Sequence, residues 1–563
     1  MLPIVTAEQM RALDDETIHK LGVPGAVLME SAGRGVVELL WQLHARRKLD
    51  LHAAQVVIVA GPGNNGGDGL VVARCLHGRG VAVRLLLCAE RERVRGDALL
   101  HLLAAEASGV GIKIHSGESG AAQVAAQLQQ LDRGDVLVDA LLGTGLQRAV
   151  SGPLRTVIEA ANRSAALRIA VDLPSGLDAD RGIPEGSGPE PVILRADHTV
   201  TFGFCKLGQV SAPGFTFGGR LHLVDIGIPE ALNTRHGVRA RLLDGTCLQR
   251  LGQARSPLAH KGSNGHLLII AGSRGKIGAA LLCARAALRT GVGLCTLAAP
   301  ESAEPTIAPA LSTSAPEAMS SFYPLPGPGG SAEALAQAWL AAGAGKHAVA
   351  IGPGLPTGSG DDTVRAALLA LLASGSTPLV LDADALNQLV GEDEALRRAA
   401  RARPIVLTPH PGEAARLLGQ SVPEVQADRV QSARTLSQRT GAVVLLKGAR
   451  TLVVAPDEPP VSAPPLATLS VVPTGNAGMG SGGMGDVLTG MIGALLAAGW
   501  PAHDAACAGA YWHGLAGDRV ALRRAPGSVL LATELIDALD EARQLGLGTP
   551  PAAGWPLREV AAC

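Results

Sequence analysis

GNAGMGSGGMGD, residues 475–486, leads directly into the apolar segment 487–500. Its six glycines let the backbone approach an anion closely, and successive free N–H groups at a helix start bind phosphate. Asp486 ends the stretch, where its carboxylate can accept a proton from a hydroxyl group that attacks a phosphoryl group. Neither common nucleotide motif has this spacing, and a flexible linker is not expected to lead straight into an apolar helix. The stretch therefore predicts a phosphate site at the start of a buried helix.

The composition indicates a globular chain with several domains. Its 563 residues are 47% hydrophobic and 18% charged, which favours about two or three well-buried domains over disorder. The formal net charge is -1 and no basic block occurs, so we expect no nucleic-acid partner. No apolar run reaches the roughly 18 residues that a membrane span needs, so we expect no membrane partner.

The eight cysteines occur singly, without a C-x-x-C pair. This spacing favours free thiols in a reducing compartment over disulfides or a zinc site. The first residues soon become charged and do not resemble a signal peptide. We therefore expect a cytoplasmic protein, and we also expect a homo-oligomer.

Apolar β segments alternate with helical patterns along most of the chain, which predicts parallel sheets and an α/β fold. A first helix is predicted from Thr6. The predicted strands lie at 55–60, 81–88, 136–139 and 168–172 in the first half, and at 266–271, 293–297, 348–351, 378–382, 405–408 and 443–447 in the second. We expect one domain at 1–228, a linker at 229–256, a second domain at 257–545 and a loose Pro- and Ala-rich tail at 546–563.

A second glycine-rich stretch follows the strand at 55–60, since residues 59–74 read VAGPGNNGGDGLVVAR. Its glycines suit a strand-to-helix turn around a phosphate, with the helix dipole and free N–H groups facing the ligand. Asn64, Asn65 and Asp68 add donors and oxygen ligands that a purely structural turn would not need. A Gly/Asn turn without a ligand stays open as an alternative.

Two further loops follow strand ends, VDALLGTGL at 138–146 and VDLPSGLD at 171–178. Because such loops converge on one crevice of an open α/β sheet, we expect Asp139, Asp172 and Ser175 to meet Asn65 there. Carboxylate, amide and hydroxyl oxygens suit a hard or alkali cation. Each aspartate alone could instead cap a helix, but three such loops together favour a site.

As a set, these three motifs resemble the NAD(P)H-hydrate epimerase domain over roughly residues 1–228. The resemblance implies a Rossmann-like domain that interconverts the R and S forms of hydrated NAD(P)H, with K⁺ held by Asn65, Asp139 and Ser175. We also assign a catalytic role to Asp139. The implied dinucleotide contacts are Asn64, Asn65, Gly66, Gly67, Asp68, Gly143, Thr144, Gly145, Leu146, Gln147, Arg148, Ala149 and Asp172. Lys206, in TFGFCKLG at 201–208, either adds a charge at this site or lies on the surface.

Four motifs in the second half accompany residues 475–486. They are KGSNGHLLIIAGSR at 261–274, IGPGL at 351–355, TPHPGE at 408–413 and LLKGART at 445–451. Together they resemble the ADP-dependent NAD(P)H-hydrate dehydratases of the ribokinase-like superfamily, over about residues 257–543. This resemblance implies transfer of the terminal phosphoryl group of ADP to the hydroxyl group of the S hydrate, followed by loss of phosphate. Mg²⁺ is expected to accompany ADP.

The second resemblance also implies roles for individual residues. Asp486 is the predicted base, and the N–H groups of Gly482, Gly483 and Gly485 form the predicted anion hole. The implied AMP contacts are Lys447, Gly448, Ala449, Arg450, Thr451 and Gly485, and the implied hydrate contacts are Ala279, Gly354, His410 and Asp486. His410 could instead cap a helix. Asp382, Asp384 and Asn387 follow a strand and could either assist the site indirectly or cap a helix.

Two other functions stay open on the sequence. A vitamin or sugar kinase would use the same glycine-rich loop and stop at the phosphorylated product. Alternatively, the first half could be a binding module or a scaffold, with catalysis confined to the second half. The sequence also does not distinguish ADP from ATP, or NADH hydrate from NADPH hydrate.

Overall fold

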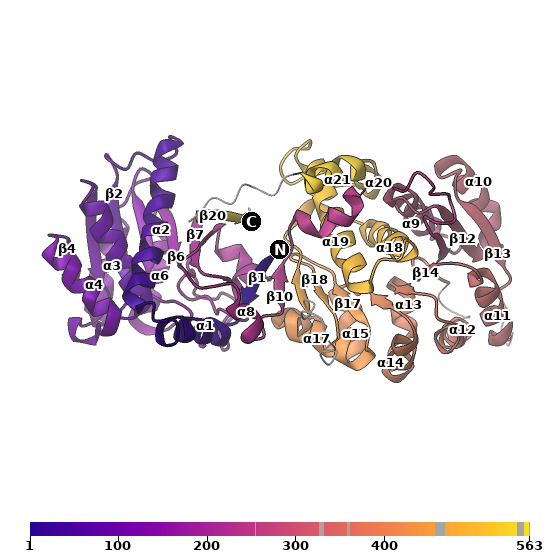
Figure 1. Cartoon of the computed structure of the whole chain (residues 1–563), viewed down its shortest axis with the longest axis horizontal. Coiled ribbons are helices and arrows are strands. Elements are labelled where there is room, and N and C mark those ends of the chain that lie inside the picture. The colour runs from indigo at the N-terminus through magenta and orange to yellow at the C-terminus, as the bar shows by residue number, and fades with distance from the viewer. Residues whose placement is uncertain (254, 326–330, 357–360, 457–467, 549–556, 562–563) are drawn as a thin grey trace. The chain divides into compact units, whose positions relative to one another are not determined.

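The computed structural model describes residues 1–253, 255–325, 331–356, 361–456, 468–548 and 557–561 (Figure 1). It divides into two compact units. The N-terminal unit comprises Leu2–Arg239 and the last described residues, and the C-terminal unit comprises Ala240–Pro550 with Met1. Both units contain a largely parallel sheet with α-helices, so the predicted α/β fold class is confirmed.

Eight strands of the N-terminal unit form a sheet in the order β20-β9-β7-β6-β5-β2-β3-β4, in which only β20 runs antiparallel to its neighbour. They are β2 (Gln55–Ala60), β3 (Ala82–Leu87), β4 (Gly111–Ile114), β5 (Val136–Ala140), β6 (Leu167–Val171), β7 (His198–Phe202), β9 (Arg220–Val224) and β20 (Leu557–Ala561). A short parallel pair joins β1 (Leu2–Val5) to β8 (Cys205–Lys206). The helices are α1 (Ala7–His19), α2 (Gly25–Ala45), α3 (Asn64–His77), α4 (Gly96–Ala107), α5 (Gly117–Leu128), α6 (Gly152–Arg163), α7 (Leu207–Val210) and α8 (Leu232–Arg235).

Alternate residues of β2 face opposite sides of this sheet. Val56, Ile58 and Ala60 pack with residues of α2, α3 and α4, whereas Val57 and Val59 pack with residues of α5 and α6. A strand that is covered on both faces needs an unbroken apolar sequence, which explains why this segment shows no polar alternation. Helices on both faces make the unit doubly wound.

The sheet of the C-terminal unit has the order β13-β12-β11-β14-β15-β16-β17-β18-β19-β10, and only β18 is antiparallel to its neighbours. Its strands are β10 (Ala240–Leu242), β11 (His266–Ile270), β12 (Leu294–Pro300), β13 (Met319–Tyr323), β14 (Ala348–Ile351), β15 (Leu379–Leu381), β16 (Ile405–Leu407), β17 (Val443–Leu446), β18 (Leu452–Val454) and β19 (Leu469–Val471). Its helices are α9 (Ile277–Thr290), α10 (Glu304–Ser314), α11 (Ala332–Gly343), α12 (Asp361–Ala373), α13 (Ala383–Gln388), α14 (Asp393–Ala402), α15 (Pro411–Leu418), α16 (Val422–Ala427), α17 (Arg429–Thr440), α18 (Met484–Ala497), α19 (Ala502–Ala521), α20 (Ala532–Asp537) and α21 (Leu539–Leu547).

The apolar segment that follows the glycine-rich loop is the central helix α18. Every residue from Val487 to Ala497 is buried, and the helix packs with α9 and β11 in the main core. Contact with α9 is so close that a Cβ at Gly490 would lie 2.1 Å from Cys283 O. The predicted helix is therefore confirmed, and its small residues set the distance between the two helices.

Each predicted strand is present, and α1 begins after Thr6 with a capping box that Gln9 completes. The expectation of a loose tail is wrong for its last part. Leu557–Ala561 pairs antiparallel with β9, where its backbone groups complete the edge of the N-terminal sheet. The segment 229–256 also holds more regular structure than a linker, namely α8 and β10. Both segments are short, so they show too few alternating residues to be recognised from sequence.

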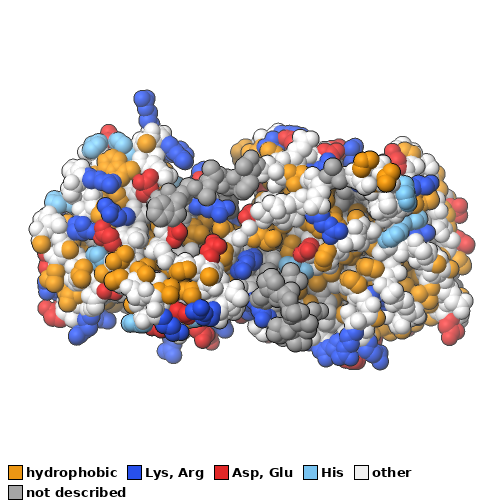
Figure 2. Space-filling view, viewed as in Figure 1, with side chains coloured by type: hydrophobic (Ala, Val, Ile, Leu, Met, Phe, Trp, Pro, Cys, Tyr) orange, Lys and Arg blue, Asp and Glu red, His pale blue; other side chains and the backbone are white. Residues whose placement is uncertain are grey.

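The mixed surface charges and the free thiols agree with the predictions from the composition. Lys and Arg side chains are interspersed with Asp and Glu over most of the face in Figure 2. In the described parts of the chain, Cys75, Cys88, Cys205, Cys247, Cys283, Cys295 and Cys507 are free. None of the described helices has both the length and the apolar character required to cross a membrane.

Gly490→Ala is expected to lower the free energy of unfolding by about 1–3 kcal/mol, because the new methyl group would overlap Cys283 O. Gly278→Ala is the matched control within α9, because a Cβ there meets nothing within 4 Å. That variant is expected to be neutral or up to about 1 kcal/mol more stable. Urea unfolding followed by circular dichroism measures both, and equal effects would contradict the close helix contact.

Candidate functional sites

The N-terminal sheet changes its direction of winding between β2 and β5, because the chain continues from β2 to β3 and β4 before it returns to β5. Ligand crevices of open α/β sheets lie at such positions. The loops after these two strands are in backbone contact, since Gly61 N donates to Ala140 O at 2.9 Å. A Cβ at Gly61 would lie 2.1 Å from Leu141 O, so only glycine allows this approach.

Helix α3 begins at Asn64, within the predicted phosphate-binding turn. A Cβ at Gly66 would lie 1.9 Å from Gly61 O, and a Cβ at Gly67 would lie 2.5 Å from Met29 Sδ. Gly63 occupies the N-cap position and offers no side-chain cap. Among the described residues, no side chain caps the amino terminus of this 14-residue helix, so its first N–H groups remain available to a ligand.

Asn65, Asp139 and Ser175 come together here through the backbone of Leu142. Asn65 Nδ2 donates to Leu142 O at 2.9 Å, and Leu142 N donates to Ser175 Oγ at 2.9 Å. Ser175 Oγ in turn donates to Asp139 Oδ1 at 2.6 Å. Asn65 Oδ1 is buried and has no hydrogen-bond partner among the described residues. A buried acceptor oxygen of this kind can be satisfied by a hydrogen-bond donor or by a cation.

Asp139 is a buried carboxylate without a basic partner in the described parts of the chain. Its residue is 1% exposed. Burial raises the pKa of Asp139 to about 6, although the side chain and N–H of Ser175 and the N–H of Leu141 stabilise the charged form. A buried anion of this kind attracts a cation, because no side-chain charge compensates it.

Lys206 is not on the surface, so that alternative is wrong. It is 1% exposed, and its Nζ donates to Asp172 Oδ1 at 2.6 Å and to Thr201 Oγ1 at 3.0 Å. Asp172 has a φ of 62°, which is unusual for a residue with a side chain. The ammonium group and a hydrogen bond from Gln209 Nε2 to Asp172 O hold this conformation. Such strain is common at binding and catalytic sites.

Asp14 and Asp68 belong to the same electrostatic cluster. Burial raises the pKa of Asp14 to about 6, while nearby Lys206 lowers it and Asp172 raises it. Burial also raises the pKa of Asp68 well above its ordinary value, and Asp172 and Asp14 add to this effect. Asp14 was not among the predicted site residues, because an acidic residue within the DDE run of an amphipathic helix is typical of a solvated face.

The other predicted dinucleotide contacts of the first half are less closely clustered. A Cβ at Gly143 would lie 3.3 Å from Asn65 Cβ, so Gly143 lies at the cluster. Thr144 and Leu146 are half-buried, whereas Asn64, Gly145, Gln147, Arg148 and Ala149 are exposed. Ala149 N donates to Glu185 O at 3.2 Å, which links the end of this loop to another loop of the unit. Dinucleotide binding by these residues stays a prediction.

The C-terminal sheet changes its direction of winding between β11 and β14. The loops after these strands meet, since Gly272 N donates to Pro353 O at 2.8 Å. Gly354, with a φ of 64°, lies against the start of α9, and a Cβ there would lie 3.4 Å from Ala279 Cβ. The structure thus brings together two residues that the sequence analysis assigned to the same ligand.

Asp486 lies in the first turn of α18, next to an ion pair between Lys447 and Asp382. Lys447 Nζ donates to Asp382 Oδ1 at 2.7 Å, and Thr489 Oγ1 donates to Asp382 Oδ2 at 2.7 Å. A Cβ at Gly485 would lie 3.2 Å from Lys447 Nζ, so the backbone of the glycine-rich loop reaches the ammonium group. The two predicted nucleotide-binding segments therefore meet at one point.

The charges of this site influence one another. Burial and then Asp382 raise the pKa of Asp486 to about 6, while Lys447 lowers it. Burial opposes the charge of Lys447, but Asp382 and Glu413 raise its pKa above the ordinary value, so it remains an ammonium. Glu413 was not among the predicted site residues, because its position in TPHPGE also fits a helix first turn.

Of the residues considered as helix caps, His410 caps a helix through its side chain and Asp382 does not. His410 does cap α15, since its Nδ1 accepts from Gly412 N at 2.9 Å and from Glu413 N at 3.3 Å. Asp382 occupies an N-cap position but makes no cap hydrogen bond, because its carboxylate binds Lys447 and Thr489 instead. Contact of His410 with a hydrate stays a prediction.

The glycine-rich loop is anchored rather than free. Asp518 on α19 accepts from Gly475 N and from Asn476 Nδ2, both at 2.9 Å. Ser481 Oγ donates to Leu530 O at 2.6 Å. Gly483, with a φ of 92°, turns the chain into α18 and provides no side-chain cap. These contacts fix the loop while its last glycines stay available at the helix start.

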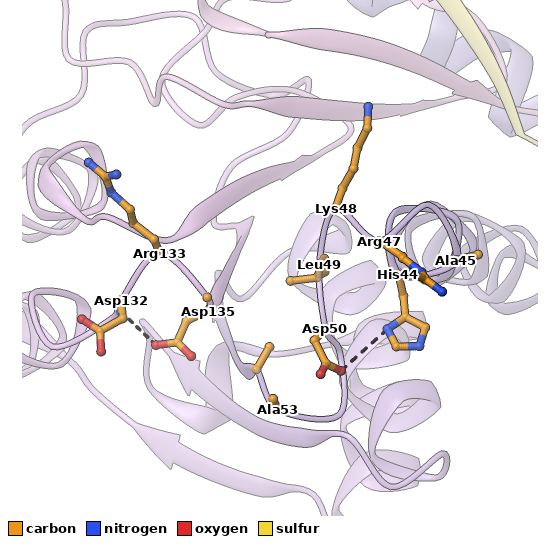
Figure 3. Close-up of a pocket in the computed structure, with 12 residues that line it drawn as sticks. His44, Ala45, Arg47, Lys48, Leu49, Asp50, Ala53, Asp132, Arg133 and Asp135 are labelled. Atoms are coloured by element: carbon orange, nitrogen blue, oxygen red, sulfur yellow. Dashed lines mark hydrogen bonds and ion pairs between the residues drawn. The ribbon is translucent and has the colours of Figure 1, made fainter.

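A separate hollow of about 890 Å³ lies near the amino-terminal ends of β2 and β5 (Figure 3). Its charged side chains include Arg47, Lys48, Asp50, Asp132 and Arg133. Asp50 pairs with His44 at 3.9 Å, so part of this charge is satisfied within the rim. Because ligands of open α/β sheets bind at the carboxyl ends of the strands, this hollow is not the candidate site.

Both units are doubly wound, and each has carboxylates at one edge of its sheet. Each also has a glycine-rich turn that leads into a helix. Together these features define a two-domain α/β enzyme. Residues 267–541 match a family described as NAD(P)H-hydrate dehydratase, and residues 25–208 match one described as the YjeF-related protein N-terminus. The chain belongs to the family of bifunctional NAD(P)H-hydrate repair enzymes. Both resemblances found in the sequence are thereby confirmed.

Relatives match over nearly the whole length. A bifunctional NAD(P)H-hydrate repair enzyme of Moorella thermoacetica is 39% identical over 541 residues, covering 95% of this chain and 96% of the relative. One of Escherichia coli is 36% identical over 536 residues, covering 95% and 92%. A crystal structure of the ADP/ATP-dependent NAD(P)H-hydrate dehydratase from Bacillus subtilis is 31% identical, with a TM-score of 0.42, and covers 52% of this chain and 94% of its own.

Lys206→Met is expected to lower the free energy of unfolding by about 3 kcal/mol, because it leaves the half-buried carboxylates of Asp172 and Asp14 without their cation. Lys113→Met, at an exposed position of β4 in the same unit, is expected to change it by less than about 0.5 kcal/mol. Adding Asp172→Asn to Lys206→Met is expected to recover part of the loss. Urea unfolding at pH 8 measures these changes, and an equal effect of the two single variants would refute the buried pairing.

Proposed function

We propose that this chain repairs hydrated NADH and NADPH. Its N-terminal unit would interconvert the R and S hydrates, and its C-terminal unit would use ADP to dehydrate the S hydrate to NAD(P)H, AMP and phosphate. The observation that carries this proposal is the position of Asp486 beside Lys447 at the start of α18. A carboxylate, an ammonium group and free helix N–H groups at one point are what phosphoryl transfer requires.

The dehydration would take place in two steps. The hydroxyl oxygen of the hydrate attacks the terminal phosphorus of ADP, the bond from that phosphorus to the AMP oxygen breaks, and the hydroxyl proton passes to Asp486. Since the pKa of Asp486 is about 6, its carboxylate is ionised at neutral pH and can accept that proton. The phosphate group then leaves with the C–O bonding electrons, and the neighbouring ring carbon loses a proton to water, which restores the double bond.

Lys447 would neutralise charge on the nucleotide phosphates. Its ion pair with Asp382 fixes the ammonium group beside Gly485, while Thr489 fixes the second oxygen of Asp382. Mg²⁺ would enter bound to the phosphates of ADP. The dehydratase from Bacillus subtilis that was crystallised with ATP and Mg²⁺ supports a nucleotide with this metal for the C-terminal unit.

K⁺ would be held in the N-terminal unit by Asn65, Asp139 and Ser175. The orphaned Asn65 Oδ1 and the uncompensated carboxylate of Asp139 support a monovalent cation there, because hard oxygen ligands are what an alkali ion prefers. The ion would fix the loops that bind the dinucleotide phosphates. We also propose that Asp139 and Asp14, with pKa values raised to about 6, handle the protons that epimerisation must move.

The main test follows NADH absorbance in a mixture of R and S NADH hydrates with ADP, Mg²⁺ and K⁺. The wild-type protein is expected to convert both epimers completely. Asp486→Asn is expected to lose about 10²–10⁴-fold in dehydration rate while it still binds ADP, since only the base is removed. Asp504→Asn, which changes an exposed carboxylate on α19, is the control and is expected to retain the rate.

Conversion that stops at the S fraction would refute the epimerase assignment and leave the dehydratase in place. Formation of a stable phosphorylated hydrate without NADH would favour a kinase instead. No ADP-dependent recovery at all would refute the function proposed for the C-terminal unit.

The K⁺ site is expected to compete with protons. Because burial raises the pKa of Asp139 to about 6, its ligating carboxylate is present above that pH and is lost as the pH falls through it. The apparent Kd for K⁺ is therefore expected to rise about tenfold per pH unit well below pH 6. The rise in Tm with KCl concentration measures this from pH 5 to 8, with NaCl as a salt control. A K⁺ effect that is pH-independent, or that survives in Asp139→Asn, would contradict the site.

A further inference from the structure

The first residue of α17, Arg429, lies behind the segment Lys447–Thr451 and was not among the predicted site residues. Arg429 is 5% exposed. Its Nη1 donates to Ala449 O at 2.5 Å, and its Nη2 donates to Leu446 O at 3.3 Å and to Lys447 O at 3.2 Å. One guanidinium group thus binds three carbonyls at the end of β17 and in the turn that follows it.

These contacts determine which way the turn faces. In a trans peptide the C=O and the following N–H point in opposite directions. Since the carbonyls of Lys447 and Ala449 point toward Arg429, the N–H groups of Gly448 and Arg450 point to the other side. A Cβ at Gly448, which has a φ of 141°, would lie 2.8 Å from Arg429 Nη2, so a side chain there would displace the guanidinium group.

The charge of Arg429 has no acidic partner in the described parts of the chain. Its Nε is buried and makes no hydrogen bond there, and its other donors bind only neutral carbonyls. Burial alone accounts for the lowering of the Arg429 pKa to about 10. A buried cation is costly unless an anion compensates it. An anion near the turn would therefore be bound more tightly because of Arg429.

Arg403 shows what a purely structural arginine of this kind looks like. It is 4% exposed, and its Nη2 donates to Leu371 O at 2.5 Å and to Leu372 O at 2.7 Å, near the carboxyl end of α12. The negative end of the helix dipole compensates that charge. Arg429 has no such helix end, because its carbonyls belong to the end of β17 and the following turn.

We propose that Arg429 is a positioning residue for the phosphates of the bound nucleotide. It directs the N–H groups of the turn outward, and the phosphate anion compensates its charge. This inference rests on the proposed binding of ADP by Lys447–Thr451. Arg429 itself does not touch the reacting atoms. Its contribution is to orient the turn and to make the local potential positive.

The test compares Arg429→Lys with Arg403→Lys in the full-length protein. Lysine keeps the charge but cannot bind three carbonyls in the geometry of the guanidinium fork. Arg429→Lys is expected to raise the Kd and the KM for ADP about 10- to 100-fold, while the KM for the S hydrate stays within about twofold. Arg403→Lys is expected to lower Tm without changing the Kd for ADP.

Isothermal titration with ADP and Mg²⁺, without hydrate, separates the outcomes. An unchanged Kd in a folded Arg429→Lys variant would overturn the inference and leave the proposed function standing. No ADP binding by the wild-type protein would instead refute the proposed function. If Arg429→Lys unfolds below 25 °C, Arg429→Gln is titrated in its place, and an unchanged Kd there would likewise overturn the inference.

Discussion

Close backbone contact at the carboxyl edge of each sheet is the constraint on which both sites depend. In the N-terminal unit, Gly61 brings the loop after β2 against Leu141 O of the loop after β5, and Gly66 brings the start of α3 against Gly61 O, both within a distance that any Cβ would prevent. In the C-terminal unit, Gly272 N donates to Pro353 O at 2.8 Å, and a Cβ at Gly354 would lie only 2.8 Å from Lys276 O, so the loops after β11 and β14 are equally close. Glycine is required because the neighbouring atoms are backbone carbonyls, which cannot move without loss of the sheet or helix hydrogen bonds.

The two sites use buried charge in different ways. In the C-terminal unit, Asp382 is neutralised by Lys447, so its carboxylate serves to position an ammonium group and does not need a ligand. In the N-terminal unit, Asp139 has only hydrogen-bond donors around it, and its carboxylate stays costly unless a cation arrives. The first arrangement prepares a site for an anion, and the second prepares a site for a cation.

A single function explains why such different sites share a chain. A dehydratase that accepts one epimer leaves the other behind, whereas an epimerase returns that other form to the reactive pool. The proposed energy source, ADP, would act only in the C-terminal unit, because Asp486 and Lys447, the groups proposed for phosphoryl transfer, are found there. The two activities need only exchange hydrate through solution, which requires no channel.

The sequence alone predicts the fold class, the strands that carry the motifs and the polar residues of each loop. These follow from local properties, since apolar runs, glycine spacing and the polar residues after strands are all read within a few positions. It did not determine the antiparallel strand Leu557–Ala561, the burial of Lys206, or the roles of Asp14, Glu413 and Arg429. Each of these depends on residues that are far away in the chain, as with Asp14 and Asp172, and only the packed structure brings their charges close enough to interact.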